Sequence, residues 1–295
     1  MSDKLIQINV VNLEGLPGSA NLLINKISDA IGGCAKPFQI RRVAEAEADA
    51  AKIQAVAQIE IKGLQLRAMQ RFIAEEAQKQ SNIEQITEKA LPELKTDSKP
   101  QDIENDWIVN FFDKCRLISD DQMQSLWAKV LAGQANSPGR FSKRTVNFLL
   151  TLNKSDADLF ATLCRFIWDF GDDRDVFMFG TGHPDLGLNS AVLNHLDQIG
   201  LIAYYPQGYN PKRIDAPIQC AYFGRKIFVK PKFSTQRTAD NVLIKSPTSL
   251  LSSNVNLTKI GHELAPLCEA KPVDGVYDQV AQSWARFLDV EESPD

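Results

Sequence analysis

The chain has 295 residues, of which 44% are hydrophobic and 24% charged, and its formal net charge is −4. At about 150 residues per domain this length indicates two domains, and the ordinary apolar fraction excludes a wholly disordered chain. No uncharged apolar run approaches the roughly 18 residues that a membrane-spanning helix needs. The N-terminus, Met1 to Val11, is polar and is not typical of a secretory signal, so we expect a cytoplasmic protein.

The cysteines and histidines show no metal-binding or disulfide pattern. No Cys-x-x-Cys pair occurs among the five widely spaced cysteines, which are Cys34, Cys115, Cys164, Cys220 and Cys268. The three histidines also lack metal-ligand spacing. We therefore expect reduced thiols, no metal and no cofactor. The chain contains no nucleophile elbow and no complete phosphate-loop motif, which favours a protein that is not an enzyme.

Residues 1–39 form a leader that contains one short amphipathic helix. Ser19-Ala20-Asn21 precedes this helix as a candidate cap, and Gly32-Gly33 ends it. Its apolar positions recur at near-helical spacing, at Leu22, Leu23, Ile27 and Ile31. Such a helix docks on another part of the protein or on a sister chain, or it lies on a membrane surface. The few nearby lysines give weak support for binding to anionic lipid.

Residues 40–92 are predicted to form one long amphipathic helix. Between Ile40 and Ala90 there is no proline, and eight Lys/Arg residues balance eight Asp/Glu residues. Balanced charge indicates a solvated face rather than a nucleic-acid stripe. The apolar positions follow a 4-4-3-4-4 spacing close to a heptad seam, at Ile53, Ala57, Ile61, Leu64, Ala68 and Phe72. This seam is longer than one small domain can cover, so we expect a homo-oligomer with a coiled coil.

The middle of the chain is predicted to be helical. Residues 91–102 hold two prolines in a polar run and are predicted to be a linker. Residues 103–170 then show four helical segments with short turns, which is typical of a small helical bundle. Candidate N-caps are Ser119, Ser142 and Ser155. Large aromatic side chains are expected in the core of this bundle, namely Trp107, Trp127, Phe141 and Phe148.

Residues 171–290 are predicted to form an α+β module. A helix that ends at Gly200 leads into the apolar run Leu201 to Tyr205, and Thr258 marks the start of a later helix. The order of helix, strand, further strands and closing helix resembles a winged-helix domain. The predicted fold class is therefore mainly α with a C-terminal α+β module, made of a long N-terminal helix, a small helical bundle and a winged-helix-like domain.

One segment of the middle region carries an unusual combination of residues. Gln124 to Gly133 reads Gln-Ser-Leu-Trp-Ala-Lys-Val-Leu-Ala-Gly, and Pro138 to Thr145 reads Pro-Gly-Arg-Phe-Ser-Lys-Arg-Thr. With this pattern the chain resembles a bacterial family that is catalogued as a domain of unknown function. The resemblance supplies no catalytic residue, and Gln134 stands where it leads us to expect an acidic residue. It implies an accessory protein encoded among phage-defence and mobile-element genes, with a protein partner from a neighbouring gene.

Two basic clusters are candidate binding sites. Residues 205–245 hold eight Lys/Arg and two Asp residues, a net charge of +6, with tyrosines between them. Clustered cations bind phosphates and aromatic rings stack on bases, so the candidate nucleic-acid contacts are Arg225, Lys226, Lys230, Lys232, Lys212 and Arg213. A solvated hairpin or a surface for an acidic protein fits the same pattern. A second cluster surrounds a predicted helix start and is a candidate phosphate contact, made of Arg140, Lys143 and Arg144.

These patterns favour a non-enzymatic oligomeric scaffold or sensor, and the family resemblance connects it with bacterial antiphage defence. A nucleic-acid-binding regulator that acts through the basic C-terminal module is the first alternative. A peripheral membrane effector that uses the leader helix is the second. The three hypotheses differ in whether the chain binds itself, nucleic acid or lipid.

Overall fold

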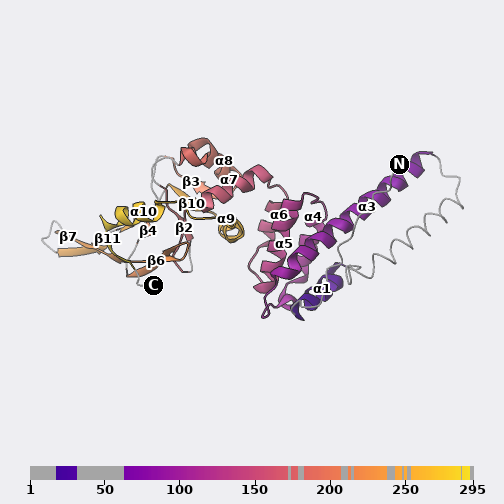
Figure 1. Ribbon diagram of the computed structural model, residues 1–295, viewed down its shortest axis with the longest axis horizontal. Coiled ribbons are helices and arrows are strands. Elements are labelled where there is room, and N and C mark those ends of the chain that lie inside the picture. The colour runs from indigo at the N-terminus through magenta and orange to yellow at the C-terminus, as the bar shows by residue number, and fades with distance from the viewer. Residues whose placement is uncertain are drawn as a thin grey trace. The chain divides into compact units, whose positions relative to one another are not determined.

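The computed structural model describes residues 18–31, 63–171, 174–178, 183–206, 212–213, 216–237, 243–247, 249–250, 254–286 and 288–292. The chain divides into two compact units, unit 1 at Met1–Thr151 and unit 2 at Leu152–Asp295 (Figure 1). The described part of unit 1 is helical, whereas unit 2 combines short helices with antiparallel strands. The fold is therefore mainly α with an antiparallel sheet in its C-terminal part, as the sequence predicted at this level.

Unit 1 contains the helices α1 (Gly18–Ile31), α3 (Gly63–Ala90), α4 (Asn105–Cys115), α5 (Asp121–Asn136) and α6 (Lys143–Leu149), with the 3₁₀ turns η1 (Leu91–Glu93) and η2 (Pro100–Asp102). Helix α3 packs along α5, and α4 packs against α1 and α6. Between them, Trp107 stacks on Phe111 and Phe111 meets Trp127 edge-on, with ring centroids 5.1 and 5.2 Å apart. These rings form the centre of the unit, as predicted for Trp107 and Trp127, whereas Phe148 is only half-buried.

Polar side chains start the helices close to the predicted positions. The hydroxyl of Ser142 accepts the N–H of Thr145 at 3.3 Å and caps α6, which confirms that cap. Helix α5 is capped one residue later than predicted, by Asp120 in place of Ser119. Aspartate has the stronger acceptor, and its Oδ1 takes two backbone N–H groups at 3.1 and 3.0 Å.

Two segments outside the predicted helical bundle are packed into unit 1. The leader helix docks on another part of the protein, which was one of its expected alternatives. Helix α1 buries Leu23 and Ile27 and packs on α4 and η2, whereas Leu22 stays 48% exposed. Unit 1 therefore covers most of the apolar face that a membrane would take. The predicted linker 91–102 starts with η1 and ends with η2, and its Leu91 is fully buried. The Ser19 hydroxyl donates to the Lys95 carbonyl at 3.1 Å and joins the two segments. The prolines therefore start 3₁₀ turns instead of opening a flexible connection.

Unit 2 contains the helices α7 (Lys154–Cys164), α8 (Ser190–Gln198), α9 (Lys259–Leu264) and α10 (Val276–Ala285), and the 3₁₀ turns η3 (Pro184–Leu186) and η4 (Ala265–Leu267). We expected α7 in the helical middle, but it packs on α8 and η4 of unit 2. Its N-cap is Asn153 rather than Ser155, because Asp156 reaches back to the Asn153 N–H at 3.2 Å and closes a capping box.

The largest described sheet of unit 2 is antiparallel, with the strand order β11-β6-β5-β1-β2. Its strands are β1 (Ile167–Asp169), β2 (Arg174–Val176), β5 (Ile218–Tyr222), β6 (Arg225–Pro231) and β11 (Leu288–Glu292). Shorter pairs join β3 (Ile202–Tyr204) to β10 (Val255–Leu257), β4 (Lys212–Arg213) to β9 (Ser249–Leu250) and β7 (Phe233–Arg237) to β8 (Leu243–Pro247). The core centres on the fully buried Trp168, which lies 4.8–5.6 Å from the rings of Tyr222, Tyr277 and Trp284.

Residues Leu257 to Gly261, with the sequence Leu-Thr-Lys-Ile-Gly, pack against the start of β3. The Thr258 hydroxyl donates to the Gly200 carbonyl at 2.7 Å and accepts the Gly261 N–H at 3.1 Å, which confirms Thr258 as a cap. A Cβ at Gly261 would stand 2.2 Å from the Leu201 carbonyl oxygen, so only glycine fits there. The motif thus fixes α9 against the end of α8 and the start of β3.

Candidate functional site

The N-terminal half of α3 presents an apolar surface. All residues from Gly63 to Gln78 are exposed, and this part of α3 extends beyond the other helices of its unit (Figure 1). We call its five large apolar side chains, which are 40–71% exposed, the α3 patch: Leu64, Leu66, Met69, Phe72 and Ile73. Three of these side chains, Leu64, Met69 and Phe72, lie on one side of α3. An exposed apolar face among charged residues is typical of a binding surface.

The α3 patch continues the stripe that the C-terminal half of the same helix buries. Phe72 and the buried Ala90 are 18 residues apart, as are Met69 and the buried Thr87, which is five turns of an α-helix. In the buried half, Ile86 has no exposed surface, and this part of α3 packs along α5. One helical face is therefore covered at one end of α3 and open at the other.

The predicted seam is described only in its second part. Ile53, Ala57 and Ile61 lie outside the described residues, as does the whole of 32–62. Leu64 and Phe72 lie on α3 and belong to the α3 patch. The prediction of a coiled coil thus rests, within the described residues, on α3 alone.

The segment that carries the family resemblance is organised around the buried Phe141. Trp107 donates from Nε1 to the Phe141 carbonyl at 2.8 Å, and the Phe141 N–H donates to Oε1 of Gln134 at 2.9 Å. The Phe141 ring packs on Gly133, where a Cβ would stand 2.7 Å from Cε2. A carboxylate at position 134 would accept the same N–H, so the difference from the expected acidic residue leaves this contact intact. These residues support the backbone of unit 1.

A cavity of about 550 Å³ opens beside this segment. Ser142 and Lys143 line it, and so do Asp102 and Glu104. Two carboxylates beside one ammonium group repel a phosphate, so the charge of this cavity favours a cation. Helix α6 is also short, with seven residues, which limits the field at its N-terminus.

The three predicted phosphate contacts do not gather around this cavity. Lys143 forms an exposed ion pair with Asp106, with Nζ 3.5 Å from Oδ2. The guanidinium of Arg140 lies over the Phe141 ring, 5.3 Å from its centroid. Arg144 is exposed and does not line the cavity. The structure brings one of the three cations to the cavity and gives the other two different surroundings.

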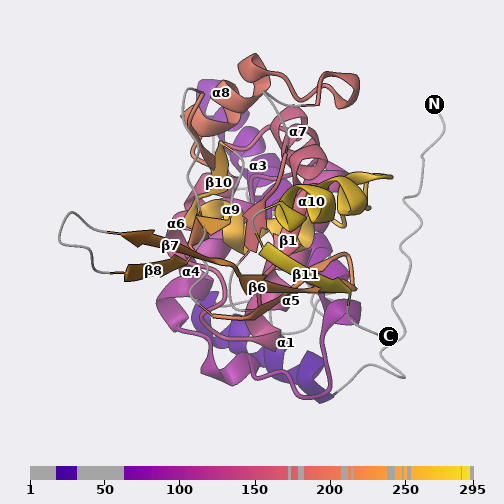
Figure 2. The same ribbon diagram turned by 90° about the vertical axis from the view of Figure 1, so that its left-hand side faces the viewer.

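Strand β6 carries three of the predicted nucleic-acid contacts, Arg225, Lys226 and Lys230, and Lys232 follows its last residue. An acidic strand lies beside β6. Figure 2 shows β11 next to β6, and the register places Lys230 opposite Asp289. The Lys230 Nζ lies 2.7 Å from both carboxylate oxygens of Glu291. Lys232 lies 3.6 Å from Asp289 and donates to a backbone carbonyl of α10 at 3.1 Å. Two of the four cations are thus engaged by β11.

The other two cations of β6 differ from each other. The Arg225 guanidinium lies 3.5 Å from the centroid of the Tyr277 ring and 3.2 Å from Oδ1 of Asp278, both on α10. Lys226 is exposed on β6. Lys212 and Arg213 form β4, which pairs with β9 and not with the sheet that contains β6. Three of the eight cations in residues 205–245 are therefore paired with carboxylates of α10 and β11.

One histidine has a carboxylate partner. Nε2 of His195 lies 2.8 Å from Oδ1 of the buried Asp156, which also closes the capping box of α7. Burial raises the pKa of Asp156, but the hydrogen bonds from His195 and from the Asn153 backbone outweigh it and lower that pKa below its usual range. This pair joins α7 to α8. Within the described residues, no three His, Cys, Asp or Glu side chains are placed to hold a metal ion.

Comparison with known proteins gives one match, to a family described as a protein of unknown function (DUF2806), over residues 66–190. The match includes most of the α3 patch, the Phe141 segment and the first part of unit 2. No curated protein and no solved structure matches the chain significantly. Among the described helices, none is long and apolar enough to cross a membrane. At residues 66–190 the chain is therefore similar to a family whose members have no assigned function, which agrees with the resemblance seen in the sequence.

Proposed function

We propose that this protein is a non-enzymatic oligomeric scaffold or sensor that assembles through the α3 patch. The observation that carries the proposal is the exposure of Met69 and Phe72 on the face that unit 1 buries farther along the same helix. Burial of apolar surface stabilises an assembly by about 25 cal/mol per Å². An exposed apolar helix face obtains this stabilisation when it pairs with another helix.

The charges along the exposed half favour a second copy of this chain in antiparallel orientation. Arg67 and Arg71 come first, and Glu75 and Glu76 follow them. Two antiparallel copies bring the basic end of one helix beside the acidic end of the other, whereas parallel copies bring like charges together. The segment from Gly63 to Lys79 is about 25 Å long at 1.5 Å per residue, which is sufficient for a two-helix contact.

Sedimentation velocity and light scattering of the full chain test this proposal. We expect the wild type to self-associate at micromolar concentrations and Met69→Glu/Phe72→Glu to be monomeric, with an unchanged far-UV circular dichroism spectrum. Val109→Glu is the matched control, because Val109 is a 46% exposed apolar residue on α4. A wild type that stays monomeric, or a double variant that still associates, contradicts the proposal.

The orientation has its own test. Glu75→Lys/Glu76→Lys makes the exposed half wholly basic and should weaken association. Adding Arg67→Glu/Arg71→Glu restores opposite charges at the two ends and should restore it. If the fourfold variant associates no better than the first pair of changes, the antiparallel arrangement is wrong even where the patch itself is the interface.

A second candidate is a nucleic-acid-binding regulator in which unit 2 has a winged-helix-like arrangement. Its support is the order α8, β3, β10, α9, with β3 and β10 paired, and the exposed Lys226 on β6. Changing Arg225, Lys226, Lys230 and Lys232 together to Gln should abolish salt-dependent binding of labelled DNA or RNA. The absence of binding by the wild type at low salt would contradict this candidate.

A further inference from the structure

Two thiols of unit 2 lie in contact with each other. Cys164 is the last residue of α7 and is buried, and Cys268 directly follows η4 and is half-buried. Both are free cysteines, and their side chains are hydrogen-bond neighbours. The proposed scaffold role uses neither of them, because it depends on the α3 patch of unit 1. Contact between two thiols is the arrangement from which a disulfide forms.

Backbone contacts hold the two cysteine segments side by side. Nε of Arg165, at the end of α7, donates to the Lys271 carbonyl at 3.1 Å, although the two residues are 106 positions apart. The Tyr222 hydroxyl donates to the Arg165 carbonyl at 2.7 Å and accepts the Val273 N–H at 2.8 Å. Helix α7 also packs on η4. The segment after α8 that carries the second cysteine is thus fixed to α7 before and after that cysteine.

The turn at Cys268 is itself held in place. The Cys268 N–H donates to the Ala265 carbonyl at 3.2 Å, and its Sγ lies 3.7 Å from the Leu264 carbonyl oxygen. The next residue, Glu269, has a positive φ of 47°, which non-glycine residues seldom adopt. Strained residues of this kind persist where the surrounding structure holds them, and they cluster at functional and switch regions.

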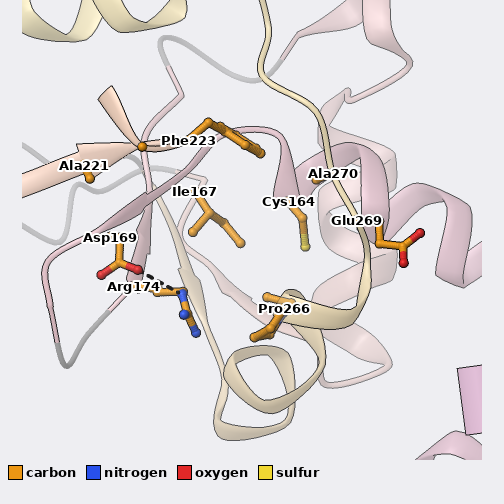
Figure 3. Close-up of a pocket in the computed structure, with 11 residues that line it drawn as sticks. Cys164, Ile167, Asp169, Arg174, Ala221, Phe223, Pro266, Glu269 and Ala270 are labelled. Atoms are coloured by element: carbon orange, nitrogen blue, oxygen red, sulfur yellow. Dashed lines mark ion pairs between the residues drawn. The ribbon is translucent and has the colours of Figure 1, made fainter. Parts of the chain in front are cut away.

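A cavity of about 410 Å³ gives small molecules access to this part of unit 2. Cys164 lines the cavity, and Figure 3 shows its sulfur between Pro266 and Glu269, which lie before and after the second cysteine in the chain. Phe223 and Arg174 belong to other walls of the cavity. Hydrogen peroxide is about as large as two water molecules of roughly 30 Å³ each, so the cavity is large enough to admit it.

We propose that Cys164 and Cys268 form a reversible disulfide when the protein meets hydrogen peroxide. The Cys268 thiolate attacks one peroxide oxygen, the O–O bond breaks, and the departing hydroxide takes the proton of the thiol, so that water and a sulfenic acid result. The Cys164 sulfur then attacks the Cys268 sulfur, the S–O bond breaks, and a second water leaves with the Cys164 proton. The two thiols lose two electrons in total, and one peroxide is reduced to two waters. A dithiol reductant reverses the change by exchange.

The surroundings of the two thiols set the order of these steps. Burial and, secondly, the neighbouring Cys268 thiol raise the pKa of the Cys164 thiol. Cys164 is therefore protonated at neutral pH and reacts slowly with peroxide from solution. Cys268 is more exposed, so peroxide reaches it first. The second step takes place within one chain between groups already in contact, which compensates for the small thiolate fraction of Cys164.

Peptide mapping of the full chain tests this inference. After treatment with hydrogen peroxide and alkylation, digestion without reductant should give a peptide that links Cys164 to Cys268, from chains that still run as monomers on a non-reducing denaturing gel. Cys34→Ser is the matched control and should give the same linked peptide. Absence of this peptide, or a link between chains in its place, overturns the proposal.

The melting temperature gives a second measurement. The bond closes a loop of about 100 residues, so oxidation should raise the melting temperature of unit 2 by about 5–15 °C, and dithiothreitol should restore the original value. Cys268→Ser should show no such rise. A rise of equal size in Cys268→Ser would show that another modification stabilises the protein.

Cys164→Ala isolates the first step. Its Cys268 sulfenic acid has no second thiol to attack it, so dimedone should label Cys268, whereas Cys164 of Cys268→Ser should stay unlabelled. Labelling of Cys164 alone would contradict the proposed order of the steps. Self-association through the α3 patch is measured by sedimentation and plays no part in these experiments, so the two proposals fail independently of each other.

Discussion

The two halves of α3 share one amphipathic pattern and have opposite surroundings. The C-terminal half, from Asn82 to Ala90, buries its stripe against the other helices of unit 1, whereas Gly63 to Gln78 exposes larger apolar side chains on the same face. Helical periodicity therefore predicts that a face will be covered but not what covers it. Five substitutions along α3 can break or sharpen this comparison.

The largest effect is expected at Ile86. Its side chain is fully buried, so Ile86→Ala should lower the free energy of unfolding by about 2–5 kcal/mol. Phe72→Ala removes a larger side chain from the exposed half and should change the unfolding of dilute protein by about 0.5 kcal/mol or less. Chemical denaturation at concentrations below those of self-association measures both. Similar losses at the two positions would show that the halves do not differ.

A smaller effect is expected at Asn82, the first buried residue of the C-terminal half. Its Nδ2 donates to the Arg116 carbonyl at 2.8 Å, and its Oδ1 accepts from Gln78 at 2.9 Å. Asn82→Ala leaves the partly buried Arg116 carbonyl without this donor and should cost about 1–3 kcal/mol of unfolding free energy. Gln78→Ala is the control on the exposed side and should cost less. A larger loss of unfolding free energy for Gln78→Ala than for Asn82→Ala would show that the packed part of α3 begins nearer the N-terminus of the helix.

The smallest effect is expected at Glu75. It pairs with Arg71 at 3.3 Å, but the two side chains are 54% and 76% exposed. Glu75→Gln should therefore change the unfolding free energy of dilute protein by about 0.5 kcal/mol or less. This is measured by the same denaturation method in low and high salt. A loss greater than that of Asn82→Ala would mean that the exposed half is already packed in the single chain.

Local patterns predicted many of the elements, and long-range pairing explains those that were missed. The apolar run Leu201 to Tyr205 predicted β3, and the Thr258 cap predicted the start of α9. Strand β11 was missed because Leu288 to Glu292 is short and acidic and follows a helix directly. Strand β1 was missed because Phe166 and Ile167 fit the periodicity of the helix before them.

Because strand β11 was not predicted, the ion pairs that it forms with the basic cluster were not predicted either. The position of Lys230 on a strand follows from its neighbours in the sequence. Its ion pair with Glu291 joins residues 61 positions apart and depends on the pairing of β6 with β11. The cavity of unit 2 was beyond prediction for the same reason, since Phe223 and Arg174 come from separate segments.

The contacts that hold Phe141 in place have a consequence for the interpretation of related chains. Three residues from two helices contact the ring, the N–H and the C=O of Phe141, namely Gly133 and Gln134 of α5 and Trp107 of α4. Because the three contacts share Phe141, changes at these residues are expected to have non-additive effects on stability. Chains that carry these residues would inherit an arrangement of helices rather than a chemistry. Functional differences between such chains would then lie at positions outside the segment around Phe141.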